Sequence, residues 1–269
     1  MHTDQMKSTQ RRGSMILAVD IGNTSIVLGG FEQNDLQFVS RLSSNLHTTQ
    51  DEYAMLISGA LALHSVDKSC IDGTIIASVV PPLNQEIKKA LLFLFGKEPL
   101  MIGPGIKSGI SIRCDMPSSV GADLIATAVA AHYLYESPAL VIDMGTATKI
   151  SVVDQQGAFI GASIIPGVTM GLNALAEQTA QLPKISLKTP DKVIAKNTVD
   201  CMRSGVLYGH ASMIDGMIDR IRQEFGKDLF ILATGGMAST VIPLCRHEIH
   251  VDEALVLKGL HILYQKNHI

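Results

Sequence analysis

Two short segments with the same pattern of acidic, glycine and hydroxyl-bearing residues are the part of the sequence best suited to chemistry. They are residues 20–24 (DIGNT) and residues 143–148 (DMGTAT). In such a segment, glycine lets the backbone approach a phosphate, hydroxyl and amide groups donate hydrogen bonds to its oxygens, and the carboxylate can hold a hydrated cation. One copy is equally well explained as an ordinary hairpin turn. Two copies can converge across a cleft and hold a nucleotide tail between them.

A third candidate is Asp123, which follows Gly121 at the head of an alanine-rich helix predicted over residues 120–135. An acidic residue in the first turn of a helix interacts favourably with the helix dipole, which is a sufficient structural reason for it. A carboxylate at this point can also act as a general base that accepts the proton of a hydroxyl group during phosphoryl transfer. The rest of the predicted helix is apolar, which favours the second interpretation.

Two other segments are less specific. Residues 234–236 (TGG) follow a predicted strand, and Gly235 and Gly236 would let a flat base or a ribose lie against the backbone. A plain tight turn is the alternative. Thr198 begins a long predicted helix, where it is expected to be the N-cap, with a substrate contact as an additional role.

Two apparent motifs are excluded. His247, Glu248 and His250 lack the H-E-x-x-H order of a zinc site and are interpreted as a polar loop. Residues 103–105 (GPG) lack the Gly-Lys-Ser/Thr that follows in a Walker motif, so they predict only a turn.

The candidate residues are positioned by two series of strands and helices in the same order. Asp20 and Asp143 lie 123 residues apart, and each ends an apolar strand that continues into a second and a third strand. Strands are expected from residue 15 and at 25–31, 36–42, 74–80, 99–102, 139–143, 149–154, 157–165 and 229–233. Helices are expected at 50–64, 84–95, 120–135, 168–180, 198–225 and 252–266.

This order predicts an α/β protein made of two copies of one domain that face each other. The paired motifs resemble those of actin-like ATPases and sugar kinases, and this resemblance implies two duplicated ribonuclease-H-like domains that face a central nucleotide cleft. The expected boundaries are residues 15–137 for the N-terminal domain and 138–269 for the C-terminal domain. Residues 1–14 are expected to form a disordered extension.

Composition excludes several classes of protein. The chain has 269 residues, of which 46% are hydrophobic and 17% charged, so it is not intrinsically disordered. A formal charge of −3 without blocks of like charge, together with the absence of tryptophan, argues against nucleic-acid binding. No apolar run approaches the ~20 residues of a membrane span. Four scattered cysteines without a C-x-x-C pair indicate reduced thiols, and a cytoplasmic location is expected.

Beyond these local patterns, eight segments in order and spacing resemble the type III pantothenate kinases. They are DIGNTSIVLG, ASVVPPL, GPGIKSGI, VGADLIATAVAA, DMGTAT, PGVTMGLNALAEQTAQLP, KNTVDCMRSGVLYG and ATGG. The family belongs to the actin-like and sugar-kinase superfamily. Its members phosphorylate pantothenate with ATP, which begins coenzyme A synthesis, and they typically need a monovalent cation. Members are dimers whose substrate pockets lie near the subunit interface, so the resemblance implies a homodimer.

The resemblance also implies a role for each matching residue. Asp123 becomes the proton acceptor, Thr146 contacts ATP, and Asp143 binds a monovalent cation, potassium or ammonium. The first phosphate loop comprises Asp20, Ile21, Gly22, Asn23, Thr24, Ser25, Ile26 and Val27, with Asp20 as a candidate ligand of the magnesium that accompanies ATP. The pantothenate pocket comprises Cys114, Gly121, Ala122, Asp123, Leu124 and Thr198.

Three positions depart from the family pattern. Leu124 stands where arginine is usual, Cys114 where tyrosine is common, and Lys149 where threonine is common. The first two changes make the substrate pocket less polar or differently shaped, since arginine is a rigid donor fork for an anion. We hypothesise that Lys149 partly replaces either the bound cation or the missing arginine.

Two other functions remain open at this point. A kinase of the same fold could act on another small alcohol, which Leu124 and Cys114 favour. A regulatory protein could keep the nucleotide cleft without catalysis, although the three retained aspartates favour an enzyme.

Overall fold

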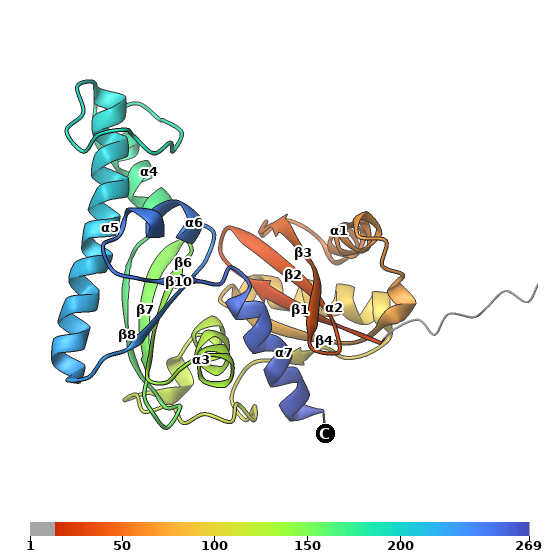
Figure 1. The fold of residues 1–269 in the computed structure, drawn as a ribbon. Helices are drawn as coiled ribbons and strands as arrows, with labels where there is room; N and C mark the ends of the chain where they lie inside the picture. The colour runs from red at the N-terminus through yellow and green to blue at the C-terminus, as the bar shows by residue number, and fades with distance from the viewer. Residues whose placement is uncertain (1–13, 269) are drawn as a thin grey trace, which may run out of the picture.

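The computed structural model describes residues 14–268 and arranges them as two five-stranded sheets (Figure 1). The disordered extension predicted for residues 1–14 therefore lies outside the described residues, apart from Ser14. The first sheet contains β1 (Met15–Ile21), β2 (Ser25–Glu32), β3 (Asp35–Ser43), β4 (Ile71–Ser78) and β5 (Leu100–Met101). The second contains β6 (Ala139–Met144), β7 (Ala147–Val153), β8 (Phe159–Pro166), β9 (Phe230–Thr234) and β10 (His250–Val251).

The two sheets have the same topology, which confirms the predicted duplication. The strand orders are β3-β2-β1-β4-β5 and β8-β7-β6-β9-β10. In each sheet the central strand pairs antiparallel with the strand that follows it and parallel with the fourth strand. As a consequence, Asp20 and Asp143 occupy equivalent positions near the ends of the two central strands.

The helices are α1 (Gln50–Leu63), α2 (Pro81–Phe95), α3 (Ala122–Leu134), α4 (Val168–Gln178), α5 (Thr198–Phe225), α6 (Ala238–Val241) and α7 (Leu255–Asn267). Helices α1 and α2 pack on one face of the first sheet, while α4, α5 and α6 pack on one face of the second. Within residues 14–268, none of these helices combines the length and the apolar character that crossing a membrane requires.

Local sequence explains where several helices begin. Thr49 and Glu52 form a capping box at the start of α1. Helix α2 begins at Pro81, three residues before the expected start at residue 84, because proline fits the first turn of a helix. The prediction that Thr198 caps α5 is wrong by one residue. Asn197 is the N-cap, and its side chain accepts a hydrogen bond from the backbone of Asp200.

Helices α3 and α7 form the layer between the two sheets (Figure 1). The apolar side of α7 packs against β1 and β4 of the first sheet, through Leu260 and Leu263. Part of α3 packs against the second sheet, where Ala128 contacts the cluster around Val141. The two helices touch closely, since a Cβ at Gly259 would overlap the carbonyl group of Ala126. The last helix of each half thus helps to cover the sheet of the other half. The boundary expected at residues 137 and 138 stays a prediction.

Candidate active site

The β1–β2 and β6–β7 turns meet in the centre of the molecule. The Oγ1 atoms of Thr24 and Thr146 lie 2.9 Å apart and share a hydrogen bond, although 122 residues separate them in the chain. The first turn is closed by a hydrogen bond of 3.0 Å from the Gly22 N–H to the Ser25 carbonyl. The expectation that the two turns converge is confirmed.

A cavity of about 700 Å³ lies at this junction, a volume typical of sites for small molecules. It brings together most residues that the sequence predicted for a site. These are Asp20, Gly22, Asn23, Thr24, Ser25, Val27, Cys114, Gly121, Asp123, Leu124, Asp143, Thr146, Gly235 and Gly236.

Four predicted residues do not line the cavity. The side chains of Ile21 and Ile26 are buried in the core of the first half, where they pack under α1 and α2. Ala122 packs in the cluster between α3 and α7. Thr198 is exposed at the start of α5. The side chains of these two isoleucines therefore anchor the β1–β2 turn to the core.

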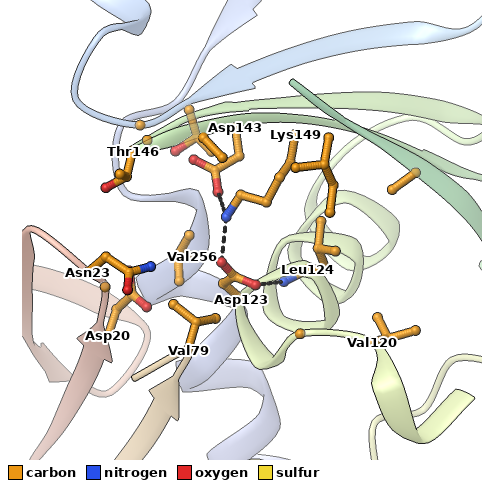
Figure 2. A pocket seen from close by; sticks show the side chains of 18 of the residues that line it. Asp20, Asn23, Val79, Val120, Asp123, Leu124, Asp143, Thr146, Lys149 and Val256 are labelled. Atoms are coloured by element: carbon orange, nitrogen blue, oxygen red, sulfur yellow. Dashed lines mark hydrogen bonds and ion pairs between the residues drawn. The ribbon is translucent and has the colours of Figure 1, made fainter. Parts of the chain in front are cut away.

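Lys149 bridges Asp123 and Asp143, two of the five carboxylates that line the cavity (Figure 2). Its Nζ atom lies 2.6 Å from Oδ2 of Asp143 and also forms an ion pair with Oδ2 of Asp123. The register of the sheet places Asp143 directly opposite Lys149 on β7, so both side chains stand on the same face. The other oxygen of Asp123 accepts a hydrogen bond of 2.7 Å from the backbone N–H of Leu124. Both oxygens of Asp123 are thus held in place.

Burial and the charges of neighbouring residues together shift the pKa values of Asp20, Asp143 and Lys149. Burial raises the pKa of Asp20 to about 7, and the nearby charges of Asp123 and Asp143 add to this rise. Burial also raises the pKa of Asp143, against the opposing effect of Lys149. Burial alone would lower the pKa of Lys149, but the two carboxylates outweigh it and raise the pKa above its ordinary value. Lys149 therefore stays charged. Asp20, unlike Asp123 and Asp143, has no ion pair with a cationic side chain among the described residues.

We expect Asp20→Asn to stabilise the protein, most strongly at alkaline pH. An unfolded Asp20 ionises near pH 3.8, whereas the folded residue ionises near pH 7. The folded state consequently holds a proton that the unfolded state loses, and stability falls as the pH rises from about 4 through 7. Asparagine cannot ionise, so the variant is expected to gain about 1–3 kcal/mol at pH 8 and less at pH 5. Urea denaturation without nucleotide or metal measures this, and an equal gain at both values of pH would contradict it.

Arg41 is a cavity residue that the sequence analysis missed. It stands on β3 opposite Val27, and its Nη1 atom donates a hydrogen bond of 3.3 Å to the Ser25 hydroxyl in the first turn. No motif marks this arginine in the sequence. Only the pairing of β2 with β3 brings it beside the β1–β2 turn. Arg41 and Lys149 are the two cationic side chains among the described residues that line the cavity.

One end of the cavity has an apolar wall next to Asp123. Leu124 and Val120 lie on this side in Figure 2. We use the name apolar wall for the lining residues Cys114, Val120, Leu124, Phe159, Ala162 and Ile164, of which Cys114, Val120, Leu124 and Phe159 pack in one cluster. At the other end are the two turns, with their hydroxyl groups and backbone amides. This arrangement can hold phosphate groups between the turns and present a carboxylate to an alcohol whose carbon skeleton rests on the apolar wall.

Among residues 14–268, no group of three or more histidine, cysteine, aspartate or glutamate side chains is arranged to hold a metal ion by itself. In the segment His247 to His250, which lacks the order of a zinc motif, His247 forms hydrogen bonds with two aspartates of α5. The Nε2 atom of His247 forms a hydrogen bond of 2.9 Å with Oδ1 of Asp219, and the backbone N–H of His247 donates a hydrogen bond to Asp215.

Comparison with known proteins identifies the family. The sequence profile of the family described as type III pantothenate kinase matches residues 16–220. A type III pantothenate kinase from Moorella thermoacetica is 40% identical over 253 residues, which cover 94% of this chain and 100% of that protein.

Solved structures show the same fold at low sequence identity. Component A of (R)-2-hydroxyglutaryl-CoA dehydratase from Acidaminococcus fermentans is 15% identical, with a TM-score of 0.57 over 94% of this chain and 97% of its own. The ethanolamine utilization protein EutJ from Carboxydothermus hydrogenoformans is also 15% identical, with a TM-score of 0.53 over 92% and 89%. These likenesses support the actin-like arrangement of two ribonuclease-H-like domains.

Proposed function

This chain belongs to the type III pantothenate kinase family, and we propose that it transfers the γ-phosphate of ATP to the primary hydroxyl of pantothenate. The product is 4′-phosphopantothenate, and this reaction is the first step of coenzyme A synthesis. The observation that carries the proposal is the position of Asp123, which lies between the converged turns and the apolar wall of one cavity. A carboxylate at that point can face an alcohol on one side and a phosphate chain on the other.

In the proposed mechanism the chain mainly positions the reactants. The hydroxyl groups of Thr24 and Thr146 and the backbone of the two turns hold the phosphates, and Arg41 adds a positive charge on the same side. Asp123 accepts the proton of the pantothenate hydroxyl as that oxygen attacks the γ-phosphorus in line. Phosphoryl transfer asks for little covalent chemistry from a protein, so positioning and charge neutralisation account for the rate.

We propose Asp20 as the protein ligand of the magnesium that accompanies ATP. The family implies a divalent metal, which neutralises the charge of the phosphates when it is bound. Magnesium usually takes one or two carboxylates and obtains its other ligands from phosphates and water. Asp20 fits that role, because it lines the cavity and has no bonded cation among the described side chains.

Asp143 is not free to bind the monovalent cation that the resemblance implies, in contrast to Asp20 and magnesium. The ammonium group of Lys149 already lies 2.6 Å from the Asp143 carboxylate and is paired with Asp123 as well. No step of the mechanism is therefore assigned to a bound potassium or ammonium ion.

Arg41→Met is expected to raise the KM for ATP by about tenfold and to leave kcat within about threefold. The guanidinium group can pair with phosphate oxygens beside the first turn, whereas methionine keeps an unbranched, flexible stem without the charge. Steady-state kinetics at saturating pantothenate measure both constants. An unchanged KM for ATP would place Arg41 outside the phosphate site.

We also propose that the kinase is a homodimer, as the family resemblance implies. Thr198, which that resemblance assigns to substrate binding, is exposed outside the cavity of its own chain. A second copy is the arrangement that would bring this residue to a pocket. Light scattering after size-exclusion chromatography should give twice the mass of 28.9 kDa. A cytoplasmic location is proposed with it, since all four cysteines are free thiols.

A kinase for another small alcohol is the second candidate, and the apolar wall favours it. Leu124 and Cys114 offer no charge to the carboxylate of pantothenate. A coupled assay of ADP release separates the two, with pantothenate, a neutral N-alkyl pantothenamide and unrelated alcohols as acceptors. The proposal predicts the highest kcat/KM with pantothenate. A hundredfold preference for another acceptor would favour the second candidate, and ADP release with no acceptor would indicate an ATPase.

A further inference from the structure

We propose that the Lys149 ammonium group is a built-in cation that makes bound potassium or ammonium unnecessary between Asp123 and Asp143. The inference rests on the proposed kinase function and concerns the regulation of that same site by ions. It predicts an enzyme whose activity does not depend on the monovalent cation in the buffer.

Lys149 and the two carboxylates are held together in a site that is largely buried. Its side chain is 16% exposed, and those of Asp123 and Asp143 are 10% and 11% exposed. Asp143 faces it across the β6–β7 pairing, and Asp123 reaches it from the first turn of α3. Two carboxylates from separate elements, β6 and α3, thus meet at one nitrogen from β7, as the dashed lines of Figure 2 show.

A free cation would compete with this arrangement. Potassium at Asp143 would need oxygen ligands, and Oδ2 of both Asp123 and Asp143 is already bonded to the ammonium group. It would also stand against a fixed positive charge in a site of low exposure, where repulsion is only weakly screened. A lysine ammonium group is itself a compact point charge with three donors, so it can take over the charge of a monovalent ion.

The same geometry argues against the other hypothesis, that Lys149 replaces the missing arginine. A cation that binds the carboxylate of a substrate must be free to face that substrate. The ammonium group of Lys149 instead forms ion pairs with two aspartates of the protein, Asp123 and Asp143. Leu124, at the position of the usual arginine, belongs to the apolar wall and packs in the cluster around Ala128 and Val141.

The first half of the chain provides an internal comparison. Asp20 is the counterpart of Asp143, and it faces Val27 where Asp143 faces Lys149. The hairpin forms with an aliphatic residue at this position, so the lysine is not needed to build the turn. Its presence in the second half alone is explained by the charge it supplies to Asp123 and Asp143.

The test compares the wild type with Lys149→Thr, which introduces the residue common in the family. Lys227→Thr is the matched control, because Lys227 is exposed and its Nζ atom contacts only the side chain of Gln155 among the described residues. Pantothenate-dependent ADP release and melting temperature without ligands are measured in chloride salts of potassium, ammonium, sodium and N-methylglucamine at equal ionic strength. Lys149→Gln is the second variant if the threonine variant does not fold.

We expect the kcat of the wild type and of Lys227→Thr to stay within about twofold across the four salts. For Lys149→Thr, kcat should fall about tenfold or more in N-methylglucamine and recover in potassium or ammonium. Its melting temperature should rise by about 2 °C or more on adding potassium, because binding to the folded state stabilises it, while that of the wild type should not change.

Wild-type activity that is lost in N-methylglucamine and restored by potassium would overturn the inference. So would a Lys149→Thr variant with wild-type kcat and melting temperature in every salt. If no salt supports pantothenate-dependent turnover by any variant, the proposed function fails. The melting temperatures would then still decide whether potassium replaces Lys149.

Discussion

Asp123→Asn is expected to lower kcat for pantothenate phosphorylation by about 10²–10⁴-fold, the usual contribution of a general base. Asparagine has no oxygen basic enough to accept the proton of the attacking hydroxyl. Its amide oxygen can still accept the hydrogen bond from the Leu124 N–H, which holds the start of α3. The fold should therefore persist, with Lys149 still paired to Asp143.

Three measurements make this prediction specific. Circular dichroism and melting temperature should show a folded variant, and the affinity for an unreactive ATP analogue should stay within about threefold of the wild type. Asp228→Asn, at a carboxylate whose side chain is 95% exposed, serves as the control and should keep full activity. If Asp123→Asn turns over at the wild-type rate, Asp123 is not the essential proton acceptor.

Gly235→Ala is expected to lower the free energy of unfolding by about 2–4 kcal/mol. Gly235 has a φ of +93°, in the left-handed region that residues with a side chain rarely adopt. A Cβ on it would lie 2.6 Å from the backbone of Met144, the last residue of β6. Either the turn after β9 or the β6–β7 turn must move, so the affinity for ATP should also fall.

Gly236→Ala is the matched control for this effect. Among the described residues other than its two chain neighbours, no heavy atom lies within 4 Å of a Cβ built on Gly236, and its φ is not positive. Its free energy of unfolding should change by no more than about 0.5 kcal/mol. Urea denaturation of the two variants side by side separates them, and equal losses would show that the close approach to Met144 does not matter.

The duplication was predictable because its signals are local. An apolar strand that ends in Asp-x-Gly can be recognised in a window of ten residues, and it occurs at both Asp20 and Asp143. Most strands and helices begin within a few residues of their predicted positions. The short elements β10 and α6 were not predicted, since two to four residues carry no periodicity.

The rest of the site depends on contacts between distant segments. Arg41 reaches the first turn only through the register of β2 and β3. The pairing of Lys149 with Asp143 follows from one hairpin, but its pairing with Asp123 needs α3 to pack against the second sheet. Neither the composition nor the spacing of residues along the sequence predicts how α3 packs against the second sheet. The sequence pattern marked Lys149 as a departure, and the structure adds the two carboxylates that explain it.

The central claim is that this cavity phosphorylates pantothenate, and ³¹P nuclear magnetic resonance of the reaction tests it most directly. Purified protein is incubated with ATP, magnesium and pantothenate, and the phosphorus signals are followed over time. We predict a new phosphomonoester signal from 4′-phosphopantothenate that grows in step with ADP and is lost in Asp123→Asn. ADP accompanied only by inorganic phosphate, or no change in ATP at all, would contradict the account.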